Sequence, residues 1–170
     1  MRQGSIIAHG LATLMLIAAA CPPAFGATQS AQVNASTVKP LVLTKLQNLD
    51  LGTVILASGN WSNATVSISQ AGVFSCANAN VVCTGATRVA TYNVQGSNRE
   101  TVTISAPAVT LINQNDPTKT LTLVTSAPAT LVLTSSGHPG TDFSIGGSVT
   151  LNSATPAGTY VGTFNVTVDY

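Results

Sequence analysis

Residues 120–134 read TLTLVTSAPATLVLT and hold two short runs, Thr120–Val124 and Thr130–Thr134, in which threonine alternates with leucine or valine. Thr65–Ser69 and Thr101–Ser105 repeat the pattern with valine and isoleucine. A period of two places apolar side chains on one face of a strand and polar side chains on the other. Turn signals rich in Gly, Asn and Pro separate these runs, and no helical period lies between them. The sequence therefore predicts an all-β antiparallel sandwich or barrel.

The same reading along the whole chain predicts a series of short strands. Gly146-Gly147 inside one of them indicates a bulge or a break, because glycine weakens a strand interior. We expect the strands near Leu41–Leu46, Asp50–Leu56, Thr65–Ser69, Arg88–Val94, Glu100–Ser105, Lys119–Thr125, Ala129–Thr134, Asp142–Leu151 and Gly158–Tyr170.

The composition excludes several classes of protein. Only 6% of the 170 residues are charged, against about 25% in a typical soluble domain. The formal net charge is +1, which argues against a nucleic-acid partner, since that needs clustered cations. The chain is also poor in charge and rich in Thr, Ser and Asn. Because β-branched Thr favours strands over helices, this composition argues against coiled coils and ordinary helical enzymes.

The first residues are expected to be a signal peptide, residues 1–26, rather than part of the fold. Arg2 precedes the apolar run Leu11–Ala20, and small residues precede the expected cleavage after Gly26. Cys21 follows three alanines, so a lipoprotein signal is the alternative. The apolar run is short for a membrane span and no second one follows, which predicts a secreted chain without a transmembrane segment. A polar extension over residues 27–39 and one sandwich domain over residues 40–170 complete the predicted organisation.

Two cysteines remain in the predicted mature chain, Cys76 and Cys83, on either side of a plausible loop. In an oxidising compartment a single disulfide between them is the natural interpretation. Two Cys and one His cannot complete a four-ligand zinc site, so no metal and no cofactor are expected.

The sequence holds little that could support catalysis. His138 is the one histidine of the mature chain, and it lies in a Gly/Pro loop with Ser136 and Asp142 nearby. No Gly-x-Ser-x-Gly nucleophile elbow occurs, so no enzyme is expected. A secreted hydrolase would require His138, Ser136 and a carboxylate to meet in a cleft.

The last thirteen residues, Gly158–Tyr170, form the most regular predicted strand. The opposite face of the strand is mostly polar, while the first face carries Tyr160, Gly162, Phe164, Val166, Val168 and Tyr170. An ordinary edge or core strand that closes a sandwich would also show this alternation.

These residues resemble chaperone–usher pilus subunits, which are secreted, Thr-rich, Ig-like sandwiches with one disulfide. Their terminal strand starts with a glycine and ends with a tyrosine, as Gly158 and Tyr170 do here, with Phe164, Val166 and Val168 at matching alternate positions. The chain departs from the pattern by ending on the tyrosine itself and by closing a tighter cysteine loop.

A second resemblance extends over most of the predicted mature chain. It rests on four stretches: Lys39–Val54, Phe74–Cys76 with Val82–Gly85, Gly140–Gly147 and Thr155–Tyr160. In these stretches the chain resembles the bacterial secreted family called domain of unknown function 4402. The resemblance implies a pilin- or adhesin-like Ig-like sandwich and brings no established activity.

The pilus resemblance implies assembly by β-strand addition, in which a periplasmic chaperone and then a neighbouring subunit supply a missing strand. Gln29–Thr37 is the candidate donor, with small residues Ala31, Val33 and Ala35 alternating with polar ones. We therefore predict a structural subunit of a surface fibre (pilus or fimbria) or an adhesin. It would associate with itself or with other fibre subunits, after passage through the periplasm and an outer-membrane usher. The alternative is a self-contained surface or matrix binding module that does not polymerise.

Overall fold

The computed structural model describes residues 26–170 of the chain. The predicted signal peptide, apart from Gly26, and Cys21 lie outside the described residues. Close contacts divide the chain into two units, Met1–Ala35 and Ser36–Tyr170, which are treated separately. In the first unit, residues 26–35 form no strand and their side chains are exposed.

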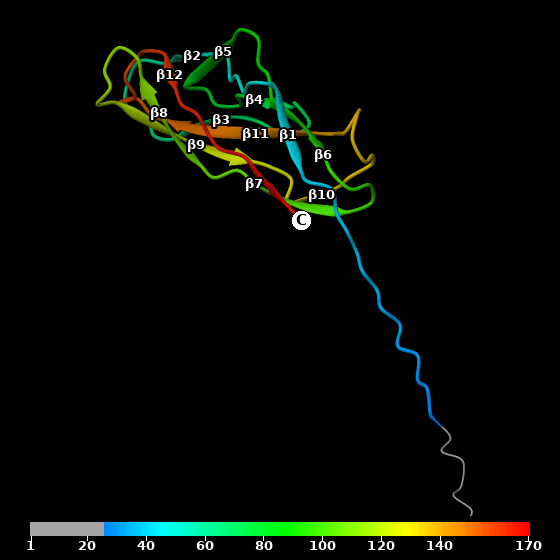
Figure 1. Cartoon of the computed structure of the whole chain (residues 1–170). Helices are drawn as coiled ribbons and strands as arrows, with labels where there is room; N and C mark the ends of the chain where they lie inside the picture. Colours follow the sequence, from blue (N-terminus) through cyan, green and yellow to red (C-terminus); the bar gives the residue numbers. More distant parts are fainter. Residues whose placement is uncertain (1–25) are drawn as a thin grey trace, which may run out of the picture. The chain divides into compact units, whose positions relative to one another are not determined.

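Ser36–Tyr170 fold into an all-β unit (Figure 1). Every strand pairing in it is antiparallel, and no α-helix occurs in residues 26–170, as predicted. The strands are β1 (Val42–Gln47), β2 (Thr53–Leu56), β3 (Ala64–Ile68), β4 (Phe74–Ser75), β5 (Val81–Thr84), β6 (Ala90–Gln95), β7 (Thr101–Ser105), β8 (Val109–Asn113), β9 (Thr120–Ser126), β10 (Thr130–Val132), β11 (Thr141–Leu151), β12 (Tyr160–Val161) and β13 (Thr167–Asp169).

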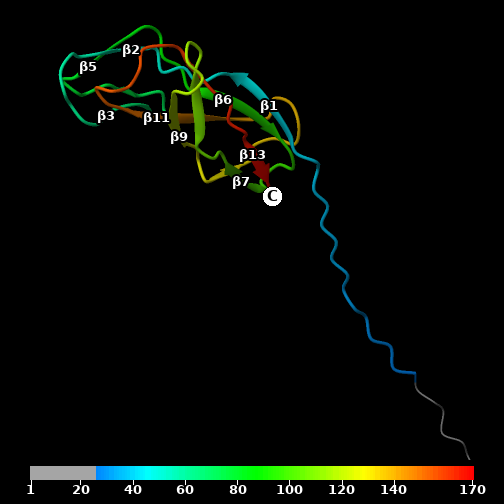
Figure 2. The same cartoon turned by 90° about the vertical axis from the view of Figure 1, so that its left-hand side faces the viewer.

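Eight strands form one large sheet whose main path runs β1-β6-β11-β9-β8-β12, with β3 beside β11 and β4 beside β3. A three-stranded sheet, β10-β7-β13, and a two-stranded ribbon, β2-β5, complete the unit. Figures 1 and 2 show β11 as the long central strand, with the ribbon and the C-terminus far from each other. The large sheet is thus faced by two smaller sheets.

Each smaller sheet covers its own hydrophobic core. The first core joins β6 and the first half of β11 to β7, and the rings of Tyr92 and Phe143 stack within it at a centroid distance of 5.6 Å. The second core joins β3, β9 and the second half of β11 to the ribbon, with Val66 and Val81 among its buried residues. In each strand the apolar alternation decides which side chains enter a core.

Strand β11 serves both cores, and its pairing partner changes at Gly146-Gly147. The residues before this point pair with β6, and the residues after it pair with β3 and β9. Phe143, Ile145 and Val149 stay buried on the same face throughout, so the predicted bulge or break is wrong. A Cβ on Gly146 would collide with the carbonyl oxygen of Ile68. Glycine is therefore required for close approach of β3 and not for a bulge.

Two Ser-Ala-Pro-Ala stretches, residues 105–108 and 126–129, carry the chain between the two layers. The first lies between β7 and β8, and the second lies between β9 and β10. Proline has no N–H to give to a ladder, so each stretch interrupts strand pairing. β8 then pairs with β9 in the large sheet, while β7 pairs with β10 in the small one. One long hairpin is thereby shared between both layers.

Candidate functional site

The terminal segment is not the continuous strand that its alternation predicted. β12 pairs with β8 in the large sheet and β13 pairs with β7 in the small sheet, while residues 162–166 belong to no strand. Val161 faces Ile112 and Thr167 faces Ser105, so the terminal segment is one residue shorter here than the chain opposite. The extra residue lies between Ser105 and Ile112 of the facing chain, the stretch that includes the Ala-Pro-Ala break at residues 106–108. The alternation was correct, but the interrupted partner prevents a continuous ladder.

Residues 162–166 make no backbone–backbone hydrogen bond to any other residue of the described chain. Their apolar side chains nevertheless remain directed at the interior. Phe164 packs against both cores, and Val166 packs against the first core. This stretch therefore combines side chains that contact the core with main-chain groups that no other strand engages.

Three strands beside the first core, β1, β10 and β13, have one open edge each in the described chain. Within residues 26–170, β13 pairs with β7 alone and β1 pairs with β6 alone. Val168 of β13 and Leu43 of β1 are both half-buried against the first core, as is Leu41 just before β1. An open strand edge presents unpaired N–H and C=O groups, which can template the addition of another strand.

The C-terminal residue closes one end of this region. The Tyr170 hydroxyl accepts a hydrogen bond from the Ser97 N–H at 2.8 Å and donates one to the Lys39 carbonyl at 2.6 Å. Lys39 donates its own N–H to the Ser97 hydroxyl at 2.7 Å. A Cβ on Gly96 would come within 2.6 Å of the Tyr170 hydroxyl, so glycine makes room for the ring. We call Tyr170, Ser97 and Lys39 the terminal clamp.

The other predicted contact residues have local roles. Gly158 lies against the buried Asn113 side chain, with which a Cβ would collide, and the Asn113 amide donates to the Ala157 carbonyl at 3.1 Å. The Tyr160 hydroxyl donates to the Pro156 carbonyl at 2.8 Å. A Cβ on Gly162 would come within 2.8 Å of a carbonyl of β8. These residues fix the start of the terminal segment against β8.

The predicted disulfide between Cys76 and Cys83 is present, with the two Cα atoms 6.2 Å apart. Cys76 follows β4 at the margin of the large sheet, and Cys83 belongs to β5 of the ribbon. Both cysteines pack against the second core. The bond therefore links the ribbon to the sheet that it covers.

The candidate donor residues Ala31, Val33 and Ala35 lie in the stretch without strands. All three are exposed, and Val33 is 89% exposed. An exposed alternation of small apolar residues in a chain segment without its own pairing suits a donor strand.

The residues named for a hydrolase are not arranged as a triad. The Ser136 hydroxyl accepts the Asn98 N–H at 2.8 Å, and its carbonyl accepts a bond from the Lys39 ammonium at 3.1 Å. No hydrogen bond joins His138 to Ser136 or Asp142 in the described part of the chain. Residues 26–170 also contain no group of three or more His, Cys, Asp or Glu side chains that could hold a metal ion.

Among the titratable groups of residues 26–170, only Tyr92 and Asp116 have clearly displaced pKa values. Burial raises the pKa of the Tyr92 phenol above its usual 10.0. Hydrogen bonds from the Thr118 hydroxyl and backbone lower the pKa of Asp116. Burial and a local turn explain these shifts, so neither marks a reactive centre.

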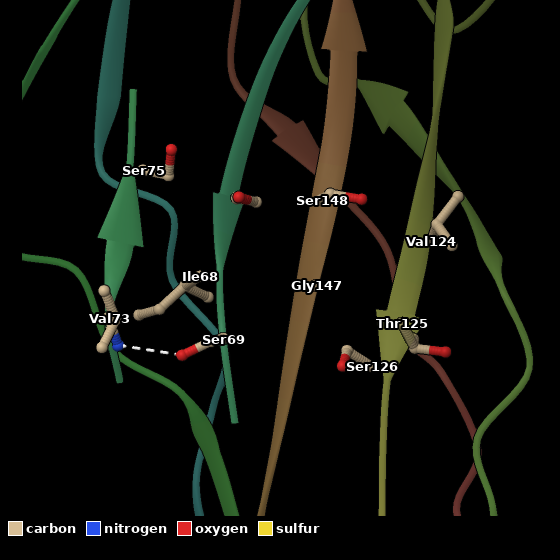
Figure 3. A pocket seen from close by; sticks show the side chains of 10 residues that line it. Ile68, Ser69, Val73, Ser75, Val124, Thr125, Ser126, Gly147 and Ser148 are labelled. Atoms are coloured by element: carbon tan, nitrogen blue, oxygen red, sulfur yellow. Dashed lines mark hydrogen bonds between the residues drawn. The ribbon is translucent and has the colours of Figure 1, made fainter. Parts of the chain in front are cut away.

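Two open depressions lie on the outer face of the large sheet. Figure 3 shows the first, where the hydroxyls of Ser69, Ser126 and Ser148 surround Gly147 and the Val73 N–H donates to Ser69 at 3.1 Å. The second lies over β1, β6 and β11 and includes His138 and the Asp142 carboxylate. Sequence reasoning missed both, because their residues come from strands that are distant in the sequence.

Comparison with known proteins identifies the family. The family model described as Domain of unknown function (DUF4402) matches residues 41–170. This match covers most of the chain, and the chain belongs to this family. Searches of curated proteins and of solved structures found no match. Among the described residues, no helix is long and apolar enough to cross a membrane.

Proposed function

We propose that this member of the DUF4402 family is a secreted, Ig-like structural subunit of a surface fibre or adhesin that assembles by β-strand addition. The observation that carries the proposal is the terminal segment. Residues 162–166 have no backbone partner in the described chain, yet Phe164 and Val166 pack against the core. A strand added here would supply hydrogen bonds to main-chain groups that now lack a protein partner.

The proposed occupant is the N-terminal extension of a neighbouring subunit, residues 27–39. Its small alternating side chains Ala31, Val33 and Ala35 can lie over a region that is already half filled by Phe164 and Val166. A bulky donor would have to displace these side chains, whereas a small one adds backbone pairing at little steric cost. Before assembly a periplasmic chaperone would cover the same edge, and an outer-membrane usher would exchange it for the neighbour. This route requires residues 1–26 to act as an export signal.

The experiment compares the exported protein with three variants on unboiled SDS gels. The wild type should form a ladder of SDS-resistant oligomers, as strand-added subunits share an uninterrupted ladder of hydrogen bonds. Deletion of residues 27–38 and Val33→Asp should both abolish the ladder, since a charge would enter the apolar face of the donor.

The matched control is Gln32→Asp, which adds the same charge to the opposite side of the extension and should keep the ladder. A protein that stays monomeric and equally stable with and without residues 27–38 contradicts the proposal. So does a ladder that Val33→Asp and Gln32→Asp change equally.

A self-contained surface module that does not polymerise is the second candidate, and the terminal clamp favours it. Tyr170 already ties the end of the chain to Lys39 and Ser97 with short hydrogen bonds. No buried side-chain nitrogen or oxygen in the described chain lacks a partner. This candidate predicts a monomer whose free energy of unfolding is unchanged by deletion of residues 27–38, so the same gels and a urea titration separate the two.

A further inference from the structure

The second depression lies on the outer face of β1, β6 and β11, away from the cores. Its cavity volume is about 370 Å³, which falls within the range of about 300–1,000 Å³ found for small-molecule sites. The loop before β11 forms one wall. The side chains that line it and carry the argument are those of Thr44, Leu46, Asn93, Gln95, His138 and Asp142.

Hydrogen bonds inside the protein hold two of these side chains in place. The Asn93 amide nitrogen donates to the Pro139 carbonyl at 2.9 Å and also to one carboxylate oxygen of Asp142. Gly140 has a φ of +81°, and a Cβ there would collide with the Asn93 amide. The loop is thus shaped around Asn93. A polar group that is already oriented loses little freedom when a ligand binds.

Several polar atoms of the depression remain available. No hydrogen bond within residues 26–170 engages the Asn93 amide oxygen, the second Asp142 oxygen or the Gln95 side chain. Carboxylate and amide oxygens accept hydrogen bonds, while the Gln95 amide nitrogen and the His138 ring can donate them. The depression therefore offers both donors and acceptors to a ligand.

An apolar surface lies beside these polar groups. Leu46 is 56% exposed, and it is the extra residue where the register of β1 against β6 shifts between Lys45 and Gln47. Bulges of this kind often re-aim side chains next to functional sites. Leu46 together with Pro139 gives the depression an apolar flank.

The charge of the lining restricts the ligand further. Asp142 is its one carboxylate, and neither Lys nor Arg lines the depression. An anionic ligand would meet the Asp142 charge without a compensating cation, while a lone carboxylate is too little for a bound metal ion. A neutral ligand with many hydroxyls and C–H faces can donate to Asp142 and Asn93, accept from Gln95 and lie on Leu46.

We infer that this depression binds a neutral saccharide, which gives the molecule a recognition function separate from strand addition. Hydroxyls of the sugar would bond to Asp142, Asn93 and Gln95, and a C–H face would lie on Leu46. The inference does not require polymerisation, because every residue of the depression belongs to one subunit.

The first test exposes the exported protein to immobilised di- and trisaccharides of glucose, galactose, mannose and N-acetylglucosamine, alongside sialylated and sulfated forms of the same cores. At least one neutral saccharide should bind more strongly than its charged counterparts. Binding to charged forms alone, or no binding at millimolar concentrations, overturns the inference.

The second test locates the binding site. The saccharide that binds in the first test is titrated into variants of the protein while their amide chemical shifts are recorded. Asp142→Asn preserves the shape and removes the charge, and should weaken binding about tenfold because charge-assisted hydrogen bonds are the stronger ones. Leu46→Asp should abolish binding. Ser148→Ala, in the depression of Figure 3, is the matched control and should leave affinity unchanged.

Shifts on binding should gather at Gln95 and His138. If Ser148→Ala weakens binding and Asp142→Asn does not, the site lies elsewhere and the inference fails. Binding should also persist in Val33→Asp, which carries the polymerisation test. A protein that polymerises without binding saccharide, or the reverse, therefore separates the failure of one proposal from the failure of the other.

Discussion

At the scale of single residues, the terminal clamp shows how much one hydroxyl can organise. Tyr170 is 44% exposed, so its ring is only partly buried, and its oxygen bridges the segment before β1 and the turn after β6. The sequence predicted Tyr170 as a strand-face residue. Its bridging role depends on the space left by Gly96, which no alternation pattern reveals.

Tyr170→Phe removes both hydrogen bonds of the clamp and leaves the ring. We expect the free energy of unfolding to fall by about 1–2 kcal/mol, since each such bond contributes about 0.5–1.5 kcal/mol net. Tyr160→Phe is the control, because that hydroxyl makes one bond, to Pro156, and its loss should cost about half as much. Urea titration measures both, and an unchanged midpoint in Tyr170→Phe would contradict the clamp.

The ionisation of Tyr92 should make the free energy of unfolding depend on pH in the alkaline range. Burial raises its pKa in the folded protein above the usual 10.0, so the folded state keeps the proton at a pH where the unfolded chain has lost it. The contribution of the protonated Tyr92 phenol to the free energy of unfolding is complete below pH 10, the usual pKa of the unfolded chain. This contribution is lost as pH rises through the raised pKa of the folded state. The free energy of unfolding should fall as pH rises from 9 upward. Tyr92→Phe should make this fall with pH less steep. If Tyr92→Phe retains the full slope of the wild type, then other groups account for it.

At the scale of elements, alternation predicted the longer strands but carried no information on which strands pair. Arg88–Val94, Glu100–Ser105 and Asp142–Leu151 overlap β6, β7 and β11, because each alternates over five or more residues. β4 and β5, which flank the disulfide loop, and β8 between two turn-rich stretches were not predicted. Two- to five-residue strands of this kind are defined by the partner that they meet, which is tertiary information.

The same limit explains the terminal segment. Its own residues favour one continuous strand, and the interruption comes from Pro107 on the facing chain. Similarly, the residues of the second depression are individually unremarkable. Asn93 and Asp142 become a pair only because β6 and β11 are neighbours in the sheet, where the two residues face each other in register.

Phe164 tests whether the unpaired stretch supports the fold. Complete burial of phenylalanine contributes about 3–5 kcal/mol relative to alanine. Phe164 is half-buried between the two cores, so Phe164→Ala should lower the free energy of unfolding by about 2 kcal/mol. Thr163→Ala, on the exposed side of the same stretch, should change it by less than about 0.5 kcal/mol. Equal urea midpoints for the two variants would show that residues 162–166 do not seal the cores.

At the scale of the whole molecule, the low charge takes on a structural meaning. Removal of residues 1–26 would take Arg2 away and leave five Lys and Arg against five Asp and Glu, a formal charge of zero. The faces of the sheets are covered with Thr and Ser instead, and several large apolar side chains remain exposed, among them Val42, Ile55 and Val82. Neutral surfaces of this kind favour association over repulsion, as the proposed assembly would require.

The division into two cores leads to the last prediction, which concerns the disulfide. The ribbon pairs with no other strand in the described chain. It is attached to the large sheet by the Asp50–Arg88 backbone bridge next to β1 and β6, by side-chain packing and by Cys76–Cys83. A closed loop of this length contributes about 2–3 kcal/mol in the chain-entropy model. In the double variant Cys76→Ser/Cys83→Ser, amides of β2 and β5 should therefore exchange with solvent about 30- to 150-fold faster. The amides of β6, in the first core, should lose less protection, because the bond does not touch that core.

Hydrogen exchange measured by mass spectrometry resolves the two regions. An equal loss in β5 and β6 would show that the cores unfold as one unit and that the disulfide stabilises the whole molecule instead of one end.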